Sequence, residues 1–187
     1  MKNYMDPTTS AQNAGEVHLS KRKFKKLRDD VLKVPFLKKG HYNRQFERIN
    51  QYLAHGDTQP AVVTSLNPLI ISAYSDEMDA VLLLRFPYEM QNMYTLKKGM
   101  RLVTSNVYFR GSQIAADIIV GEKYLNRWVD FIPMVQLFLS DDEEFIKQRI
   151  GLFQEEMWER LEILTEKRIE QNDNIKMRNG FYYLTGI

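Results

Sequence analysis

AVVTSLNPLIISAYSDEMDAVLLLRF, residues 61–86, is the stretch that decides the fold class. It holds three short runs rich in Val, Ile and Leu, separated by Asn67-Pro68 and by Ser75–Asp79. Because these separators are turn residues, the stretch predicts three strands of an antiparallel meander. The third run, residues 80–86, is apolar almost throughout. This is typical of a strand covered on both faces, so we place it centrally in the sheet.

Two apolar segments further along the chain extend the predicted sheet. Apolar residues alternate in Met100–Phe109 and in Ile114–Val120, so we expect a hairpin that turns at residues 110–113. Pro133 divides the next apolar stretch, and Val135–Leu139 would fit a last strand near a sheet edge. The sequence therefore predicts an antiparallel sheet of five to six strands.

Helical patterns lie before and after these segments. Ser20–Val34 matches a capped helix that Pro35 ends, and His41–His55 has the apolar stripe of a second helix. Ser140–Gln171 predicts a long C-terminal helix that opens with a capping box; either Gly151 bends it or one end projects. The fold class is thus α+β: two N-terminal helices, an antiparallel sheet and a long C-terminal helix packed on it.

The length and composition suit one domain. Residues 1–15 are small, polar and without periodicity, so we expect a disordered leader before a single domain at residues 16–187. The absence of cysteine excludes disulfides, Cys-ligated zinc and iron–sulfur clusters. No apolar run approaches the ~20 residues of a membrane span, and we expect no signal peptide because the polar residues 1–15 lack its hydrophobic region. We therefore expect a cytoplasmic protein.

The sequence lacks the motifs that mark common catalytic and cofactor-binding sites. It has no glycine-rich phosphate loop, no dinucleotide fingerprint, no nucleophile elbow and no HExxH zinc motif. We therefore expect no cofactor and favour a protein that is not an enzyme.

Charge is unevenly distributed along a chain whose net charge is only +2. Residues 1–50 hold 12 Lys or Arg against 5 Asp or Glu, whereas residues 140–170 hold 5 against 10. The two segments could attract each other within one fold or form two separate surfaces.

The acidic turn Asp76, Glu77 and Asp79 is a candidate metal site, because hard cations prefer oxygen ligands. With Asp117 it would support a metal-dependent hydrolase. The alternative is a solvated loop between two strands.

The basic run that includes Lys21, Arg22, Lys25 and Lys26 is a candidate nucleic-acid-binding face. An anionic membrane surface would be a similar partner, although the narrow apolar stripe without Trp argues against insertion. The alternative is a solvated helix face docked on the acidic C-terminal helix.

Two further features depend on which residues the fold brings together. Arg85 and Asp117 lie inside predicted strands and are a possible buried pair. Aromatic residues are plentiful, and they serve either the core or a protein-binding surface; for the latter the candidates are Tyr88, Tyr94, Tyr108 and Trp128.

The leading functional hypothesis is a non-enzymatic protein-interaction module, such as a small cytosolic inhibitor or immunity-type protein. Its partner would be another protein, with self-association through the C-terminal helix as a further possibility. The alternatives are a nucleic-acid-binding protein that uses the basic helix and a metal-dependent hydrolase that uses the acidic turn.

Overall fold

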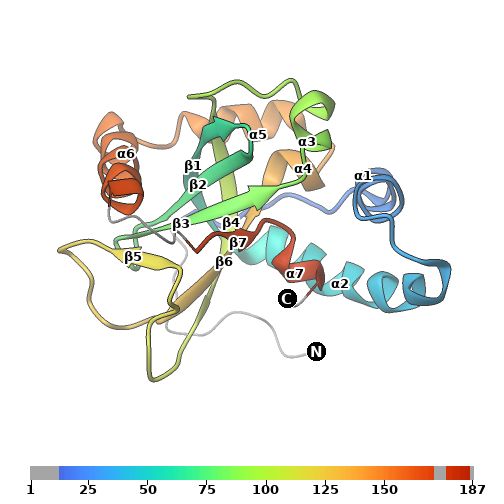
Figure 1. Cartoon of the computed structure of the whole chain (residues 1–187), viewed down its shortest axis with the longest axis horizontal. Helices are drawn as coiled ribbons and strands as arrows, with labels where there is room; N and C mark the ends of the chain where they lie inside the picture. Colours follow the sequence, from blue (N-terminus) through green and yellow to red (C-terminus); the bar gives the residue numbers. More distant parts are fainter. Residues whose placement is uncertain (1–12, 171–175, 186–187) are drawn as a thin grey trace.

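The structure is a computed structural model that describes residues 13–170 and 176–185. Over these residues the chain forms one curled, mainly antiparallel sheet with helices on both faces, which confirms the α+β class (Figure 1). The strands are β1 Asp57–Leu66, β2 Leu69–Ser75, β3 Ala80–Phe86, β4 Arg101–Phe109, β5 Ile118–Val120, β6 Asp130–Val135 and β7 Arg178–Asn179. The α-helices are α1 Lys21–Lys26, α2 Lys39–His55, α3 Glu89–Met93, α4 Gln136–Leu139, α5 Glu143–Ile150, α6 Glu155–Glu170 and α7 Tyr182–Thr185.

The predicted meander is confirmed. β2 lies between β1 and β3, with Ala73 opposite Ala61 on one side and opposite Leu82 on the other. The strand order is β5-β3-β2-β1-β4-β6, and the short β7 pairs with β3 in parallel. β3 is therefore an interior strand next to the edge, while β1 and β2 hold the middle.

Burial on both faces explains why β3 is apolar almost throughout. Leu82 and Leu84 belong to the main core, beneath the helices other than α6. Val81 points to the opposite face, where it joins a smaller core with Trp158 and Leu161 of α6. The sheet thus separates two hydrophobic layers, and α6 covers one of them.

The predicted hairpin of Met100–Phe109 with Ile114–Val120 is wrong. β4 pairs with β1 and β6, whereas the second segment is a strand only over Ile118–Val120 and pairs with β3. The chain between them leads from β4 to β5 at the opposite edge of the sheet, and on the way Ala115 donates its amide to the carbonyl of Val129. Alternation of apolar residues indicates a strand but does not identify its partner.

The prediction of a strand at Val135–Leu139 is also wrong, because most of this segment is helix α4. Its residues Phe138 and Leu139 are adjacent and both buried in the main core, which a half-exposed strand would not allow. The last strand, β6, lies just before it and contains Pro133. β6 is an edge strand, where a proline is tolerated.

The N-terminal helices follow the predicted pattern. Ser20 caps α1 by accepting a hydrogen bond from the Lys23 amide (3.1 Å), and a π-helical turn continues α1 to Val31. A 3₁₀ turn, Phe36–Lys38, then leads into α2. The first twelve residues of the predicted leader lie outside the described residues. Gly15 donates its amide to the carbonyl of Gly56, so this end of the predicted leader belongs to the fold.

The predicted C-terminal helix is divided at residues 151–154 into α5 and α6. The cap is Asp142, which accepts a hydrogen bond from the Phe145 amide, so the predicted capping box at Ser140 is wrong. The interruption lets the two parts pack on different layers: Ile146 of α5 joins the main core and Trp158 of α6 joins the smaller one. The long helix that packs on the sheet is therefore α6 alone.

Candidate functional site

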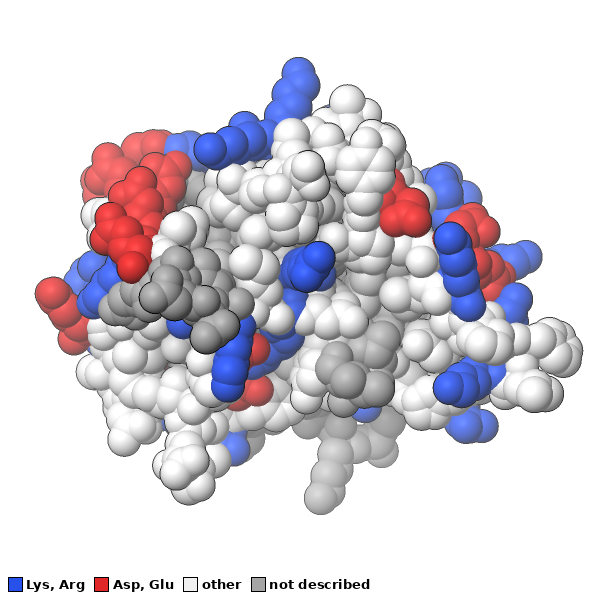
Figure 2. All heavy atoms as spheres, viewed as in Figure 1, with Lys and Arg blue, Asp and Glu red and all other residues white. Residues whose placement is uncertain are grey.

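Helix α6 presents an acidic outer face. Glu159, Ile163, Glu166 and Glu170 follow one another at spacings of four, three and four residues, which places them in one row along the helix. All four are exposed, as is Glu162 beside the row. Within the described part of the chain, Glu159, Glu162 and Glu166 form no ion pair. Acidic side chains accordingly gather over α6 at the left of Figure 2.

A shallow hollow of about 340 Å³ lies between α6 and the neighbouring strand β1. Ile169 and Val63 supply apolar parts of its lining, Glu162 and Glu166 supply carboxylates, and Lys98 supplies one cation at its edge. Such a hollow suits the aliphatic stem and cationic head of a lysine or arginine side chain.

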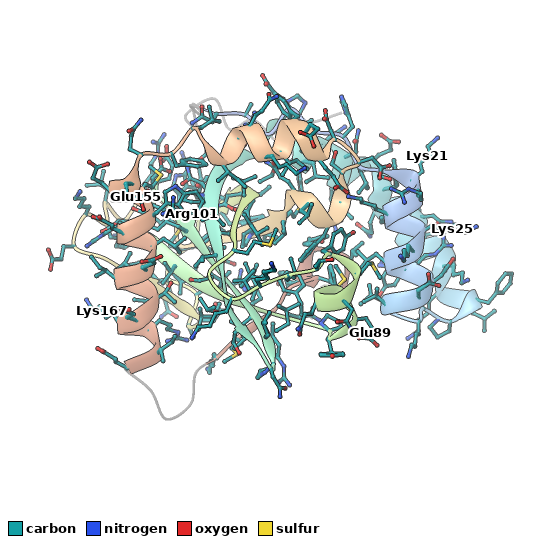
Figure 3. All side chains as sticks on the ribbon, turned by 90° about the horizontal axis from the view of Figure 1, so that it is seen from above. Lys21, Lys25, Glu89, Arg101, Glu155 and Lys167 are labelled. Atoms are coloured by element: carbon teal, nitrogen blue, oxygen red, sulfur yellow. The ribbon has the colours of Figure 1, made fainter. Side chains whose placement is uncertain are left out.

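The basic run on α1 lies at the other end of the molecule. In Figure 3 the labelled Lys21 and Lys25 are at the opposite end from Glu155 and Lys167, and Figure 1 shows the same separation of α1 from α6. The acidic and basic segments of the sequence are therefore mostly two separate surfaces.

The basic run does meet the acidic segment at the start of α5. Arg22 pairs with Asp141 (2.6 Å) and Lys23, which is buried, pairs with Glu143 (3.1 Å). Ser20 also donates a hydrogen bond to Asp141. Docking of the basic run on acidic residues is thus limited to the start of α5.

Of the predicted nucleic-acid-binding residues, Lys21, Lys25 and Lys26 are exposed, whereas Arg22 is held by Asp141. The exposed lysines lie on α1, and Lys21 and Lys25 line a groove of about 370 Å³ between α1 and α2. These three residues leave a basic face available to an anionic partner.

The acidic turn does not assemble into a metal site. Asp79 is buried and accepts two hydrogen bonds from Arg160 of α6 (2.6 and 2.9 Å). Glu77 turns instead toward the indole of Trp128, whose Nε1 donates to it at 3.2 Å. Asp76 accepts from Gln59 (2.7 Å). In residues 13–170 and 176–185, no three carboxylate or histidine side chains converge as metal ligands would.

A buried polar cluster at the start of β1 had no signal in the sequence. Asp57 is almost fully buried and accepts hydrogen bonds from Gln59 (2.7 Å) and from the hydroxyl of Tyr108 (3.1 Å). Gln59 also donates to Asp76, so one amide bridges two carboxyl groups. Burial, together with the nearby charge of Asp76, raises the pKa of Asp57 to about 7. This carboxyl group can therefore exchange a proton near neutral pH.

The predicted pair of Arg85 with Asp117 does not form. Asp117 accepts two hydrogen bonds from Arg178 of β7 (2.7 and 2.8 Å), and Arg178 also pairs with Asp130 (2.9 Å). Arg85 is exposed and lines a neighbouring hollow of about 560 Å³. The sequence pattern indicated that Asp117 needs a cationic partner, but β7, which supplies it, was not predicted.

The aromatic candidates divide between surface and core. Tyr88 is exposed, and Tyr94 is half-buried with its hydroxyl donating to the Phe138 carbonyl. Tyr108 and Trp128 are buried with ring centroids 5.7 Å apart, so neither offers a surface to a partner. They are core residues because their polar atoms find partners inside the fold, Asp57 and Glu77.

Comparison of the chain with protein-family models, with curated proteins and with solved structures finds no match. None of the helices in the described ranges has the length and apolar character that crossing a membrane requires.

Proposed function

We propose that this protein is a non-enzymatic protein-interaction module that binds a basic partner protein through the outer face of α6. The observation that carries the proposal is the set of exposed glutamates on this helix, since Glu159, Glu162 and Glu166 form no ion pair with the rest of the described fold. A partner that brings lysine or arginine side chains to Glu159, Glu162 and Glu166 would complete this surface.

Repulsion between the glutamates of this face, Glu162 included, lowers the stability of the helix, and a basic partner would offset that loss. Like charges three or four residues apart on a helix destabilise it by about 0.2–0.5 kcal/mol for each pair, and Glu159–Glu162, Glu162–Glu166 and Glu166–Glu170 are such pairs. A local sequence choice that opposes stability is expected at functional surfaces. Ile163, exposed within the row, adds apolar contact area beside the charges.

In this proposal the protein is a small inhibitor of the immunity type, which neutralises a basic protein in the cytoplasm. A metal-dependent hydrolase is not favoured, because Asp76, Glu77 and Asp79 turn to three different partners. Nucleic-acid binding remains the second candidate, and it is supported by the exposure of Lys21, Lys25 and Lys26.

The test is capture of partners from the native host with the protein and two matched variants. Glu159→Gln/Glu162→Gln should lose the captured partner, because binding depends on these charges. Glu47→Gln/Glu89→Gln removes two exposed carboxylates from α2 and α3 and should retain it. The α6 variant should also unfold at a slightly higher temperature, since it relieves like-charge repulsion.

Two outcomes would count against the proposal. Equal capture by both variants would show that α6 is not the binding face. A homo-oligomer that dissociates in the α6 variant, seen by light scattering, would assign the face to self-association instead.

A further inference from the structure

The connection between α1 and α2 carries two large apolar side chains in solvent. Phe36 is 84% exposed and Leu37 is 94% exposed. Both lie in the 3₁₀ turn where the chain reverses from one helix to the next, at the right-hand end of the molecule in Figure 1. Side chains of this size are normally buried when the fold provides a place for them.

Hydrogen bonds hold this connection in a defined shape. The amide of Val34 donates to the Arg28 carbonyl (3.0 Å), and the amide of Lys38 donates to the Pro35 carbonyl (2.9 Å). Val34, which precedes the 3₁₀ turn in this connection, is buried. The protein therefore presents Phe36 and Leu37 on an anchored projection, which we name the α1–α2 tip, residues 33–39.

The charged residues of the α1–α2 tip itself are all lysines. Lys33 and Lys38 are exposed at either side of the apolar pair, and Arg44 is exposed on the first turns of α2. Residues 31–46 contain no Asp or Glu. Two carboxylates precede these residues in the sequence: Asp29 is held between Arg28 (2.7 Å) and Lys39 (3.0 Å), and Asp30 is exposed.

We propose that the α1–α2 tip docks the protein on an anionic lipid membrane surface. Phe36 and Leu37 enter the interfacial region of the bilayer while Lys33 and Lys38 remain at the level of the headgroups. A nucleic acid would bind through the lysines alone, so its binding would not explain why Leu37 is exposed. The acidic face of α6 lies at the opposite end (Figures 2 and 3), so an anionic surface attracts the tip and repels the far end.

Co-sedimentation with vesicles tests the proposal. The protein should bind vesicles of phosphatidylcholine with added phosphatidylserine, bind phosphatidylcholine alone much less, and dissociate as salt is raised. Phe36→Ala/Leu37→Ala should lower the partition coefficient at least about tenfold, from the loss of buried apolar area. Lys33→Gln and Lys38→Gln should each lower it roughly fivefold.

Leu125→Ala/Leu152→Ala is the matched control, because it removes two exposed leucines from other loops. This control should bind vesicles like the wild type, and all variants should keep the wild-type melting temperature. The proposal is overturned if the folded wild type ignores phosphatidylserine vesicles, or if the control and the tip variant lose binding equally. It is also overturned if Phe36→Ala/Leu37→Ala binds vesicles like the wild type but no longer binds RNA or no longer forms a dimer that the wild type forms.

Fluorescence locates the contact. Phe36→Trp places an indole at the tip, and phosphatidylserine vesicles with brominated acyl chains should quench it. Trp128 and Trp158 are both buried, so the emission of the wild type should change little and serves as the background. If the introduced indole stays unquenched in a protein that sediments with the vesicles, another surface makes the contact and the proposal is overturned.

Discussion

At the scale of single residues, Asp57 is a carboxyl group whose environment favours the protonated form. Its pKa of about 7 results from burial and from the charge of Asp76, which outweigh the hydrogen bonds from Gln59 and Tyr108. In the unfolded chain the same group has a pKa near 4. Between about pH 4 and pH 7 the folded protein therefore holds a proton that the unfolded chain has released, and its stability falls as pH rises.

Asp57→Asn should remove this pH dependence. We expect the free energy of unfolding of the wild type to fall by up to about 4 kcal/mol across that interval on account of Asp57, and that of the variant to fall by correspondingly less. Urea unfolding at pH 5 and pH 8 measures the difference. Asp30→Asn, at an exposed position, is the control and should follow the wild type. Parallel pH profiles for Asp57→Asn and the wild type would contradict the assignment.

Gly180 is a second residue that the tertiary structure explains. A Cβ at this position would overlap the ring of Phe86, which is buried and packs edge-to-face on Phe138 and Phe181 (5.1 Å each). Gly180→Ala should therefore destabilise the protein by about 1–3 kcal/mol, measured by thermal unfolding. Gly40→Ala is the control, because the space around Gly40 is open and alanine favours helix. A variant at position 180 as stable as the wild type would show that the ring can move.

At the scale of elements, one ion pair fastens α6 to the β2–β3 turn. Arg160 pairs with Asp79, which also accepts hydrogen bonds from the Lys123 amide (2.9 Å) and the Tyr74 hydroxyl (3.1 Å). Burial raises the pKa of Asp79, but these hydrogen bonds outweigh it and the pKa lies below its ordinary value. The carboxylate therefore stabilises the fold above about pH 4, and this contribution is lost as the pH falls further.

Arg160→Met should cost roughly 2–3 kcal/mol at neutral pH, because it leaves the Asp79 carboxylate buried without its cation. The cost should shrink as pH falls below about 4 and Asp79 takes up a proton. Lys167→Met removes an exposed cation from the same helix and is the control. Urea unfolding at two pH values checks the prediction, and an equal, pH-independent effect of both substitutions would refute the role of the pair.

At the scale of the whole molecule, the two proposed binding surfaces lie at opposite ends and share no residue. Energies of distant sites are usually additive. We therefore expect Phe36→Ala/Leu37→Ala to capture the partner of α6 as the wild type does, and Glu159→Gln/Glu162→Gln to retain vesicle binding. Flotation of vesicles in the presence of the captured partner should then recover all three together. Loss of both activities in either variant would show that the ends are coupled.

Local sequence patterns predicted the elements that depend on neighbours in the chain. The turn residues between apolar runs placed β1, β2 and β3, Ser20 marked the start of α1, and the unbroken apolar run of β3 indicated burial on both faces. Each of these depends on backbone preferences or on a short periodicity, which the chain carries wherever it lies in space. The same patterns predicted the basic and acidic segments but not how far apart they lie.

The sequence by itself determined the α+β class, the meander and the composition of each charged segment. Only the tertiary structure decided that β4 pairs with β6, that Asp117 meets Arg178, that Asp57 is buried, and that Phe36 and Leu37 are not. These outcomes depend on contacts between residues far apart in the chain. Such contacts form where the whole molecule gains most from burial and hydrogen bonding, and no local periodicity encodes the partner.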